Sequence, residues 1–339
     1  MRRREFIAGL GGAVAWPLAA RAQQRALPVI GWLEFGYAAN LSAADIGYAA
    51  NLSAADIDAF WQAIGEHGYV EGRNVEILYR SAEGQFERLP ELAADLVRRR
   101  VAVIVAGGTW AALAAKKATA TIPIVFWVGS DPVQAGLVAS LNRPGSNVTG
   151  TTYLQTELAA KRLELLHEMA PAAKSIGYLH YNPNPSIPAV NELSITALET
   201  AAGILAVRLV TAKATTASEI EEAFAMLVGE GVGALIVGGD LVYWANQIIP
   251  LAAHYALPAI YDFREMVEAG GLISYEGDFR DALRVASTYV GRILKGEKPA
   301  DLPVQQSTRI KVVLNLKTAK ALGLTVPQSI LLSADEVIE

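Results

Sequence analysis

The stretch VAVIVAGGTWAALAAKKATATIPIVFWVGS, residues 101–130, decides the fold. It opens with an apolar, valine-rich run of strand length at 101–108, continues with an alanine-rich helical segment at 109–119, and ends with a second apolar run at 122–130. Two neighbouring strands joined by one helix run parallel, because the helix returns the chain to the starting edge of the sheet. Uninterrupted apolar strands of this kind are buried on both faces, so we predict a parallel sheet covered by helices on both sides.

The same alternation of strands and helices extends from this stretch in both directions. Around it we expect strands at 27–35, 74–80 and 147–154 and helices at 58–69, 88–100 and 131–141. A second round follows, with helices at 157–170, 189–203 and 218–230 and strands at 175–181, 207–212, 234–240 and 258–263. Two complete rounds predict an α/β fold made of two doubly wound parallel-sheet lobes.

The remaining residues are too few for a third lobe. They contain one strand at 270–277, one amphipathic helix at 278–299 that ends near Gly296, and a strand-like tail. These elements best complete the two existing sheets, so the chain is expected to cross between the lobes more than once and to form a multi-strand hinge. We expect an N-terminal lobe of 27–153 plus 272–297 and a C-terminal lobe of 154–271 plus 298–339.

The first 22 residues have the character of an export signal. A basic start, MRRREF, precedes a mildly apolar stretch that is too short to span a bilayer, and Ala20-Arg21-Ala22 offers a small-x-small cleavage site. The pair Arg3-Arg4 fits a twin-arginine signal; a general secretory signal and an N-terminal membrane anchor are the alternatives. We expect cleavage after Ala22 and a periplasmic mature protein.

Composition excludes several kinds of site. The chain has no cysteine, which rules out disulfides, iron–sulfur clusters and thiol catalysis, and its four scattered histidines give no metal-binding motif. A net charge of −5 makes nucleic-acid binding a poor match. Neither a dinucleotide fingerprint, a P-loop nor a nucleophile elbow is present, so we expect no cofactor, no metal and no enzyme activity.

In open parallel sheets a ligand binds beyond the carboxyl ends of the strands, and two facing lobes place both sets of ends around one cleft. Hydroxyl groups and free backbone N–H groups at helix starts suit a carboxylate, acidic side chains suit an ammonium group, and tyrosines suit an apolar or aromatic side chain. The candidate ligand-binding residues at the expected strand ends are Glu34, Thr109, Ser130, Asp131, Tyr181, Asn182, Asp240, Tyr261 and Tyr275. They predict an amino acid or a related small carboxylate. Thr109 and Asp131 are equally compatible with plain helix N-caps.

Long segments of the sequence resemble the substrate-binding proteins of ABC transporters, in the family that includes tryptophan- and tyrosine-binding members. The matching segments include GYVEGRNVEI (68–77), TIPIVFWVGSDPVQAGLVASLNRPGSNVTG (121–150), PAIYDFREMVEAGGLISY (258–275), VGRILKGEKPADLPVQQ (290–306) and NLKTAKALGLTVPQSILLSADEVIE (315–339). The resemblance implies a type I periplasmic-binding-protein fold, closure of the lobes around a small solute, and delivery of that solute to a permease in the inner membrane. We expect a monomer. A ligand-sensing protein of the same fold and, less readily, an enzyme are the alternatives.

One stretch departs from the family pattern. Residues 36–46 and 47–57 repeat the same eleven letters, GYAANLSAADI, whereas the family resemblance implies one short loop and one helix there. Eleven residues are about three helical turns, so an extra copy changes the phase of the helix by only ~20°. We interpret the repeat as a duplication that the fold has absorbed, with Ser53 as the helix cap. Because it follows Glu34, the repeat bears on whether Glu34 contacts the ligand.

Overall fold

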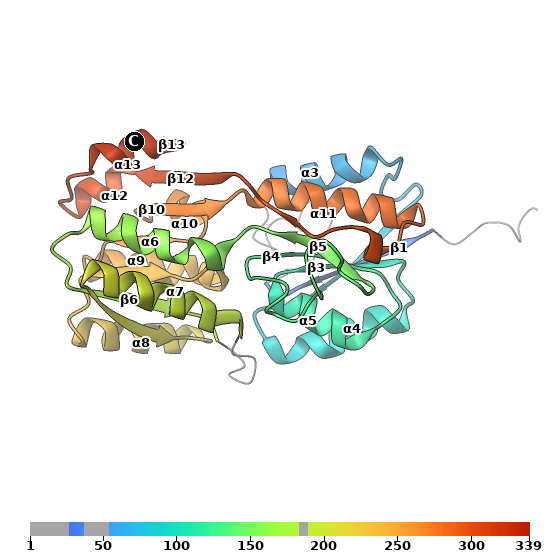
Figure 1. Ribbon diagram of the computed structural model, residues 1–339, viewed down its shortest axis with the longest axis horizontal. Coiled ribbons are helices and arrows are strands. Elements are labelled where there is room, and N and C mark those ends of the chain that lie inside the picture. The colour runs from blue at the N-terminus through green and yellow to red at the C-terminus, as the bar shows by residue number, and fades with distance from the viewer. Residues whose placement is uncertain (1–26, 37–53, 183–188) are drawn as a thin grey trace, which may run out of the picture.

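The computed structural model describes residues 27–36, 54–182 and 189–339, and the side chains of 54–56 and 189–191 are outside that description. The expected signal segment and most of the eleven-residue repeat therefore lie outside the described residues. The described chain forms two lobes side by side, each a sheet between two layers of helices (Figure 1). This arrangement confirms the predicted fold class.

The first lobe is built on a six-stranded sheet in which every pair of neighbours is parallel. Its strands, in the order β11-β5-β4-β3-β1-β2, are β11 (Gln305–Gln306), β5 (Val148–Thr152), β4 (Ile124–Val128), β3 (Val103–Gly107), β1 (Val29–Glu34) and β2 (Glu76–Ser81). One face carries α3 (Ala54–Gly65) and α11 (Phe279–Leu294), and the other carries α4 (Leu89–Arg98) and α5 (Thr109–Ala118). Short helices η1 (Phe86–Arg88) and η3 (Pro299–Asp301) lie in the connections.

The second lobe repeats this plan on a seven-stranded sheet, in the order β13-β12-β10-β9-β8-β6-β7. The strands are β6 (Ser175–His180), β7 (Arg208–Lys213), β8 (Ala234–Val237), β9 (Ala259–Tyr261), β10 (Ile273–Gly277), β12 (Ile310–Asn315) and β13 (Glu336–Ile338). The main helices are α6 (Gln155–Met169) and α7 (Ala189–Leu205) on one face and α8 (Ala217–Gly229) and α9 (Ala245–His254) on the other. The shorter ones are η2 (Gly239–Trp244), α10 (Arg264–Glu268), α12 (Leu316–Ala321) and α13 (Gln328–Ser333). Among the described strands of this sheet, the pair of β12 with β10 is the one antiparallel pair.

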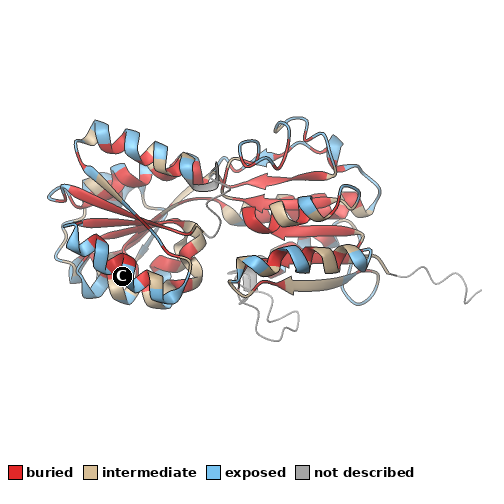
Figure 2. Cartoon of the chain, turned by 90° about the horizontal axis from the view of Figure 1, so that it is seen from below, coloured by how far each residue is buried: buried red, intermediate tan, exposed pale blue. Residues whose placement is uncertain are grey.

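The central strands are buried and the helices cover them with apolar faces (Figure 2). All five residues of β3 and of β4 are buried, as the uninterrupted apolar runs predict. Helix α11 shows the complementary pattern, because its buried residues recur every three or four positions. Asp278 caps its start by accepting a hydrogen bond from Asp281 N at 3.0 Å, and Gly296, with φ 101°, follows its last turn.

The described chain crosses between the lobes three times, as the multi-strand hinge predicts: between β5 and α6, between β10 and α11, and between β11 and β12. The crossings do not coincide with the expected boundaries at 272 and 298. Strand β10 belongs to the second sheet, because it pairs with β9 and β12, and β11 belongs to the first, because it pairs with β5. The sequence of a single strand near the C-terminus does not indicate which of the two sheets the strand will join.

The crossings pack closely against one another. Ser307 N donates to Thr152 O at 2.8 Å, Asp278 N donates to Arg309 O at 2.8 Å, and Lys311 Nζ lies 2.9 Å from Asp278 Oδ2. A Cβ atom at Gly277 would overlap the backbone oxygen of Tyr153, so only glycine allows the first and second crossings to touch here. The hinge is therefore a bonded bundle of three segments.

The helix expected at 131–141 is wrong, because this segment forms a series of turns. Asp131 Oδ1 accepts hydrogen bonds from the backbone N–H groups of Val133 at 2.7 Å and Gln134 at 3.1 Å, an arrangement that supports a turn. Gly136 then takes φ 73°, which ends any helical run. The apolar spacing of the segment serves to bury Leu137 and Val138 without a helix.

Candidate functional site

The carboxyl ends of the parallel strands of both lobes meet around one cavity. In each lobe the sheet order reverses beside the first strand, at β1 and β3 in the first lobe and at β6 and β8 in the second, which is where an open α/β sheet forms a crevice. The cavity is lined by Gly108, Thr109, Gly129, Ser130, Tyr153, Gln155, Thr156, Tyr178, His180, Tyr181, Ser194, Gly238, Gly239, Asp240, Asp262 and Phe263. Its volume is about 70 Å³.

The structure brings four of the predicted residues together in this cavity: Thr109, Ser130, Tyr181 and Asp240. Thr109 Oγ1 and Ser130 Oγ lie 2.9 Å apart and both side chains are buried. From the second lobe, Asp240 Oδ2 accepts a hydrogen bond of 3.2 Å from Trp110 Nε1 of the first lobe. Hydroxyl groups from one lobe therefore face a carboxyl group from the other.

Helix α5 begins at the wall of the cavity. Its N-cap is Gly108, with φ 82°, and no side chain caps its start. Thr109 is the first helical residue and does not serve as the N-cap, so its hydroxyl is available to the cavity. The backbone N–H groups of the first helical turn have no acceptor within the helix, and they carry the positive end of the helix dipole. This corner suits an anionic group.

Four predicted residues lie outside the lining of the cavity. Asp131 uses its carboxylate in the local turn, and it is not the helix N-cap that the alternative interpretation expected, because no helix begins there. Tyr261 lines a separate cavity between α9 and α12, Tyr275 packs on the core under α6, and Asn182 follows β6 partly exposed. Successive side chains of a strand point to opposite faces of the sheet. A tyrosine near a strand end therefore packs under a helix as often as it faces the cavity.

Glu34 lies in a second cavity that adjoins the first. The two share Gly108, Tyr153, Gly239, Asp240 and Phe263, and the second adds Glu34, Trp127, Val242, Tyr243, Glu265 and Phe279. The second cavity has a volume of about 50 Å³ and is surrounded largely by aromatic rings. The site as a whole thus has a polar half with hydroxyl groups and an aromatic half.

Acidic side chains dominate the electrostatics of the site. Burial raises the pKa of Glu34 to about 8 and that of Asp240 to about 6. Burial also raises the pKa of Asp262, and the positive charge of the Arg162 guanidinium offsets part of this rise. His180 stays neutral, because burial and the nearby Lys213 lower its pKa to about 4. Among the described residues, neither cavity is lined by lysine or arginine, so a bound cation would relieve the excess of carboxyl groups.

Arg162 holds the floor of the site, and the sequence analysis did not identify it. Its side chain is 2% exposed and its Nη1 lies 2.9 Å from Asp262 Oδ1. It also donates to the backbone oxygens of Tyr275 and Gln155, at 2.8 and 2.9 Å, and to the Gln155 side chain. Asp262 in turn accepts a 2.8 Å hydrogen bond from Gly239 N. An arginine within the apolar spacing of α6 was the available signal.

Other lining residues went unassigned for a simpler reason. Tyr178, His180 and Ser194 come from inside β6 and from the second turn of α7, where a sequence pattern predicts core packing. Tyr178 and His180 stack with ring centroids 5.3 Å apart and form one wall. Position along a strand did not reveal them, because the cavity extends below the strand ends.

The two lobes touch across the site. Besides Trp110 and Asp240, Tyr243 OH of the second lobe donates to Glu34 Oε1 of the first at 3.3 Å. The rings of Phe35 and Tyr181 lie 5.1 Å apart, and one continuous hydrophobic cluster extends through both lobes. The structure is therefore a closed form with the site between the lobes.

Comparison with known proteins gives the family. Residues 52–338 match the model of the family described as ABC transporter substrate binding protein. The chain belongs to this family. Solute-binding proteins of more distant sequence share the two-lobe fold, which is that of type I periplasmic binding proteins.

Three relatives are informative about this family member. A tyrosine-binding protein of Clostridioides difficile (strain R20291) is 30% identical over 268 residues, which cover 78% of this chain and 75% of the relative. An ABC domain in complex with L-Trp from Streptococcus pneumonia is 25% identical, covers 92% of this chain and 100% of its own, and superposes with a TM-score of 0.77. A ligand-free, open substrate-binding protein with adhesive properties from Clostridium difficile is 26% identical. The match covers 92% of this chain and 99% of that protein, with a TM-score of 0.59.

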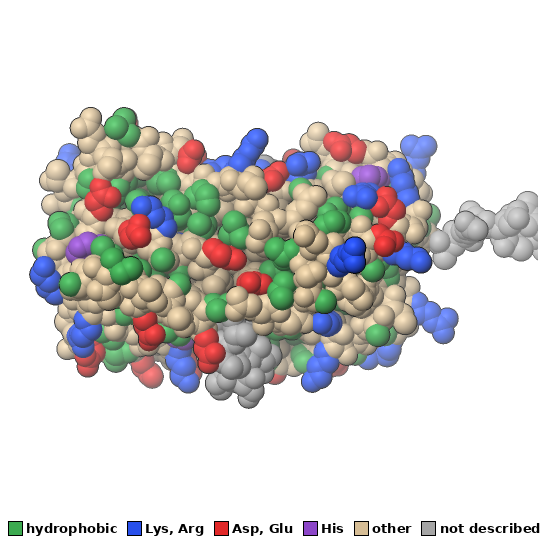
Figure 3. All heavy atoms as spheres, viewed as in Figure 1, with side chains coloured by type: hydrophobic (Ala, Val, Ile, Leu, Met, Phe, Trp, Pro, Cys, Tyr) green, Lys and Arg blue, Asp and Glu red, His purple; other side chains and the backbone are tan. Residues whose placement is uncertain are grey.

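Two further properties of the described residues concern membranes and metals. No described helix combines the length and the apolar character that crossing a bilayer needs. Nowhere in the described parts of the chain do three or more histidine, cysteine or acidic residues gather in a way that could hold a metal ion. The face in Figure 3 mixes acidic and basic side chains over both lobes.

Proposed function

We propose that this protein binds an amino acid with an aromatic side chain between its lobes and delivers it to an ABC transporter permease. The observation that carries the proposal is the composition of the site: a polar half with a helix start, two hydroxyl groups and a carboxyl group adjoins a half walled by aromatic rings. These are the groups that a zwitterion with an aromatic side chain requires.

The ligand carboxylate binds at the start of α5, where the hydroxyl groups of Thr109 and Ser130 and the free N–H groups of the first turn converge. The ligand ammonium pairs with Asp240, whose pKa of about 6 falls when a cation binds beside it. Asp262 is already paired with Arg162 and orders this wall.

The arrangement of the two cavities supports the same placement. They adjoin and share Tyr153 and Phe263, so a ligand whose head group lies in the polar cavity extends its ring past these two side chains into the aromatic half. An aromatic ligand also agrees with the relatives, of which one is named for tyrosine and one was solved with L-Trp.

The transport cycle follows from the hinge. Binding between the lobes favours the closed form, because the ligand contacts both lobes at once only when they are closed. We propose that the closed form docks on the permease as a monomer, that residues 1–22 direct export to the periplasm, and that the bound solute is not chemically changed.

The test is a thermal-shift screen of the exported form against all common amino acids, small carboxylates and aromatic amines. A ligand at 100 times its dissociation constant stabilises the protein by about 2.7 kcal/mol, so binding is readily detected. Tryptophan or tyrosine should raise the melting temperature of the wild type, and should raise that of Ser130→Ala by less. Thr200→Val, which alters an exposed hydroxyl on α7, is the matched control. A screen in which only non-aromatic solutes stabilise the protein would refute the proposal.

A further inference from the structure

Three buried polar atoms behind the aromatic half of the site have no hydrogen-bond partner among the described residues: Trp32 Nε1, Glu34 Oε2 and Tyr79 OH. Trp32 and Tyr79 are direct neighbours across the β1–β2 pair, and Glu34 lies two residues beyond Trp32 on the same face of β1. Tyr243 OH donates a hydrogen bond to the same carboxyl at Oε1, and the Glu34 charge raises the pKa of Tyr79, so these groups lie around one carboxyl. Buried polar groups in native proteins are rarely left without partners.

Glu34 lines the aromatic cavity, and its Oε2 is buried in the wall of that cavity. A Cβ atom on Gly107 would overlap Oε2 and would lie 2.7 Å from the Trp127 ring, so Oε2 lies against the β3 backbone and near a ring that lines this cavity. Among the described residues, the other oxygen, Oε1, accepts two long hydrogen bonds, from Phe35 N and Tyr243 OH at 3.3 Å each. Oε2 is therefore an acceptor without a partner directly behind the surface of the cavity.

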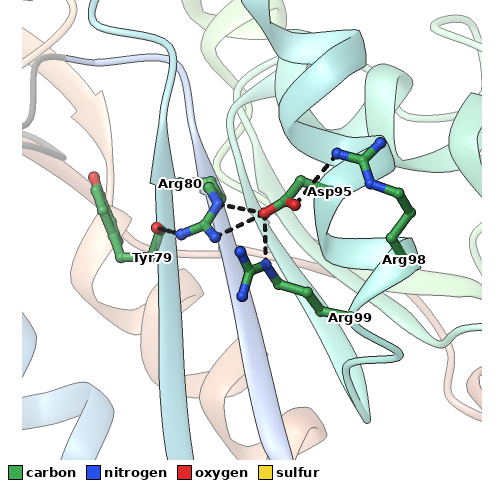
Figure 4. A network of polar contacts seen from close by, with 5 residues as sticks. All are labelled: Tyr79, Arg80, Asp95, Arg98 and Arg99. Carbon is green, nitrogen blue, oxygen red and sulfur yellow. Dashed lines mark hydrogen bonds and ion pairs between the residues drawn. The ribbon is translucent and has the colours of Figure 1, made fainter.

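Among the described residues, no lysine or arginine forms an ion pair or a hydrogen bond with this acceptor. The nearest arginine in sequence on the neighbouring strand, Arg80, points to the opposite face of β2, away from the Tyr79 ring (Figure 4). There it binds Asp95 through Nε at 2.8 Å and Nη2 at 2.7 Å, together with Arg98 and Arg99. A group bound in the cavity that Glu34 lines can supply the partner that Glu34 lacks.

We propose that Glu34 is a specificity-determining residue that hydrogen-bonds a polar group on the far edge of the ligand ring, with Phe35 N and Tyr243 OH positioning its carboxyl through Oε1. The inference rests on the proposed function and narrows it. The ligand class is an aromatic amino acid whose ring carries a hydrogen-bonding group, a phenol or an indole N–H, and phenylalanine is discriminated against. A site built for such a group disfavours an analogue that lacks it, because the buried partner is then left unpaired.

The test is isothermal titration of tyrosine, tryptophan, phenylalanine and 4-fluorophenylalanine into the wild type and two variants of Glu34. We expect the wild type to bind tyrosine or tryptophan at least about tenfold more tightly than phenylalanine and 4-fluorophenylalanine. Glu34→Gln keeps an acceptor and should keep the preference. Glu34→Met should lose it while still binding phenylalanine, which also shows that the variant folds. Glu76→Gln, on the exposed end of β2, is the matched control.

The outcomes separate this inference from the proposed function. Two outcomes would refute the role of Glu34: phenylalanine binds as tightly as the better of tyrosine and tryptophan, or Glu34→Met still prefers tyrosine or tryptophan to phenylalanine. Glu34 then does not hydrogen-bond the ligand ring, and an ordered water bonds its carboxyl instead. In either case aromatic amino-acid binding itself stands. If no aromatic amino acid binds the wild type, the proposed function fails and this inference fails with it.

Discussion

Replacing Arg162 with methionine removes the cation under the binding site and leaves most of its volume filled. In the wild type the guanidinium is paired with Asp262 at 2.9 Å, and it satisfies two backbone carbonyl oxygens and the Gln155 side chain. Both side chains of the pair are nearly inaccessible to water, at 2% and 10% exposure. Removing one partner of such a buried pair costs about 3–5 kcal/mol, because the other charge remains buried without compensation.

This loss is measurable by thermal unfolding. For about 300 residues at about 2.1 cal/mol/K each, the entropy of unfolding is roughly 0.6 kcal/mol/K, so the melting temperature should fall by about 5–8 °C. The loss should also depend on pH. Without the guanidinium the pKa of Asp262 in the folded protein rises further above its unfolded value, so the folded state binds more protons than the unfolded state. The variant therefore loses stability relative to the wild type as the pH rises above about 4.

Differential scanning calorimetry of Arg162→Met, Arg162→Met/Asp262→Asn and the wild type across this pH range provides the assay. The double variant should recover part of the loss and remove its pH dependence, because no buried carboxylate is left unpaired. A loss below about 1 kcal/mol, the size of an exposed ion pair, or an equal loss at all pH values would refute the reasoning.

Three further predictions follow from the hinge and the cleft. Gly277→Ala should destabilise the protein strongly and lower its affinity for solute, since the added methyl group overlaps the Tyr153 carbonyl; urea unfolding and titration with tryptophan check both effects. Ligand binding at about pH 6 should release protons, because an ammonium group lowers the raised pKa of Asp240; titration in two buffers of different ionisation enthalpy measures the release, and Asp240→Asn should diminish it. Trp110→Phe removes the 3.2 Å hydrogen bond that joins the closed lobes, so it should shift the unliganded protein toward the open form in small-angle X-ray scattering; an unchanged radius of gyration would contradict this role.

The doubly wound lobes were predictable because the local sequence of each central strand identifies it as a buried strand. The run 101–108 is apolar at nearly every position, and β3 and β4 are buried throughout, so composition alone shows that both faces are covered. The segment 131–141 misled for the opposite reason. Its apolar residues have helical spacing, but the Asp131 carboxylate and Gly136 favour turns, and a hydrogen bond of this kind competes with the helix.

The site was partly predictable because strand ends in such folds converge. Thr109, Ser130, Tyr181 and Asp240 each lie within three residues of the end of a strand and meet in one cavity. Tyr261 and Tyr275 also lie near strand ends, yet their side chains point into other layers, and a strand pattern does not fix which face such a residue occupies at the end of a short strand. Arg162 acts from within a helix whose other buried residues are mostly apolar, so its role depends on a tertiary contact with Asp262.

The most direct test of the central claim is a calorimetric titration of tryptophan and tyrosine into the wild type and into Thr109→Val/Ser130→Ala. The account predicts one binding site per chain in the wild type, for at least one of the two amino acids, and a loss of at least about tenfold in affinity in the variant. That loss corresponds to about 1.4 kcal/mol for the two hydroxyl groups that face the ligand carboxylate. Equal binding by both proteins would place the solute elsewhere, and no binding by the wild type would contradict aromatic amino-acid recognition.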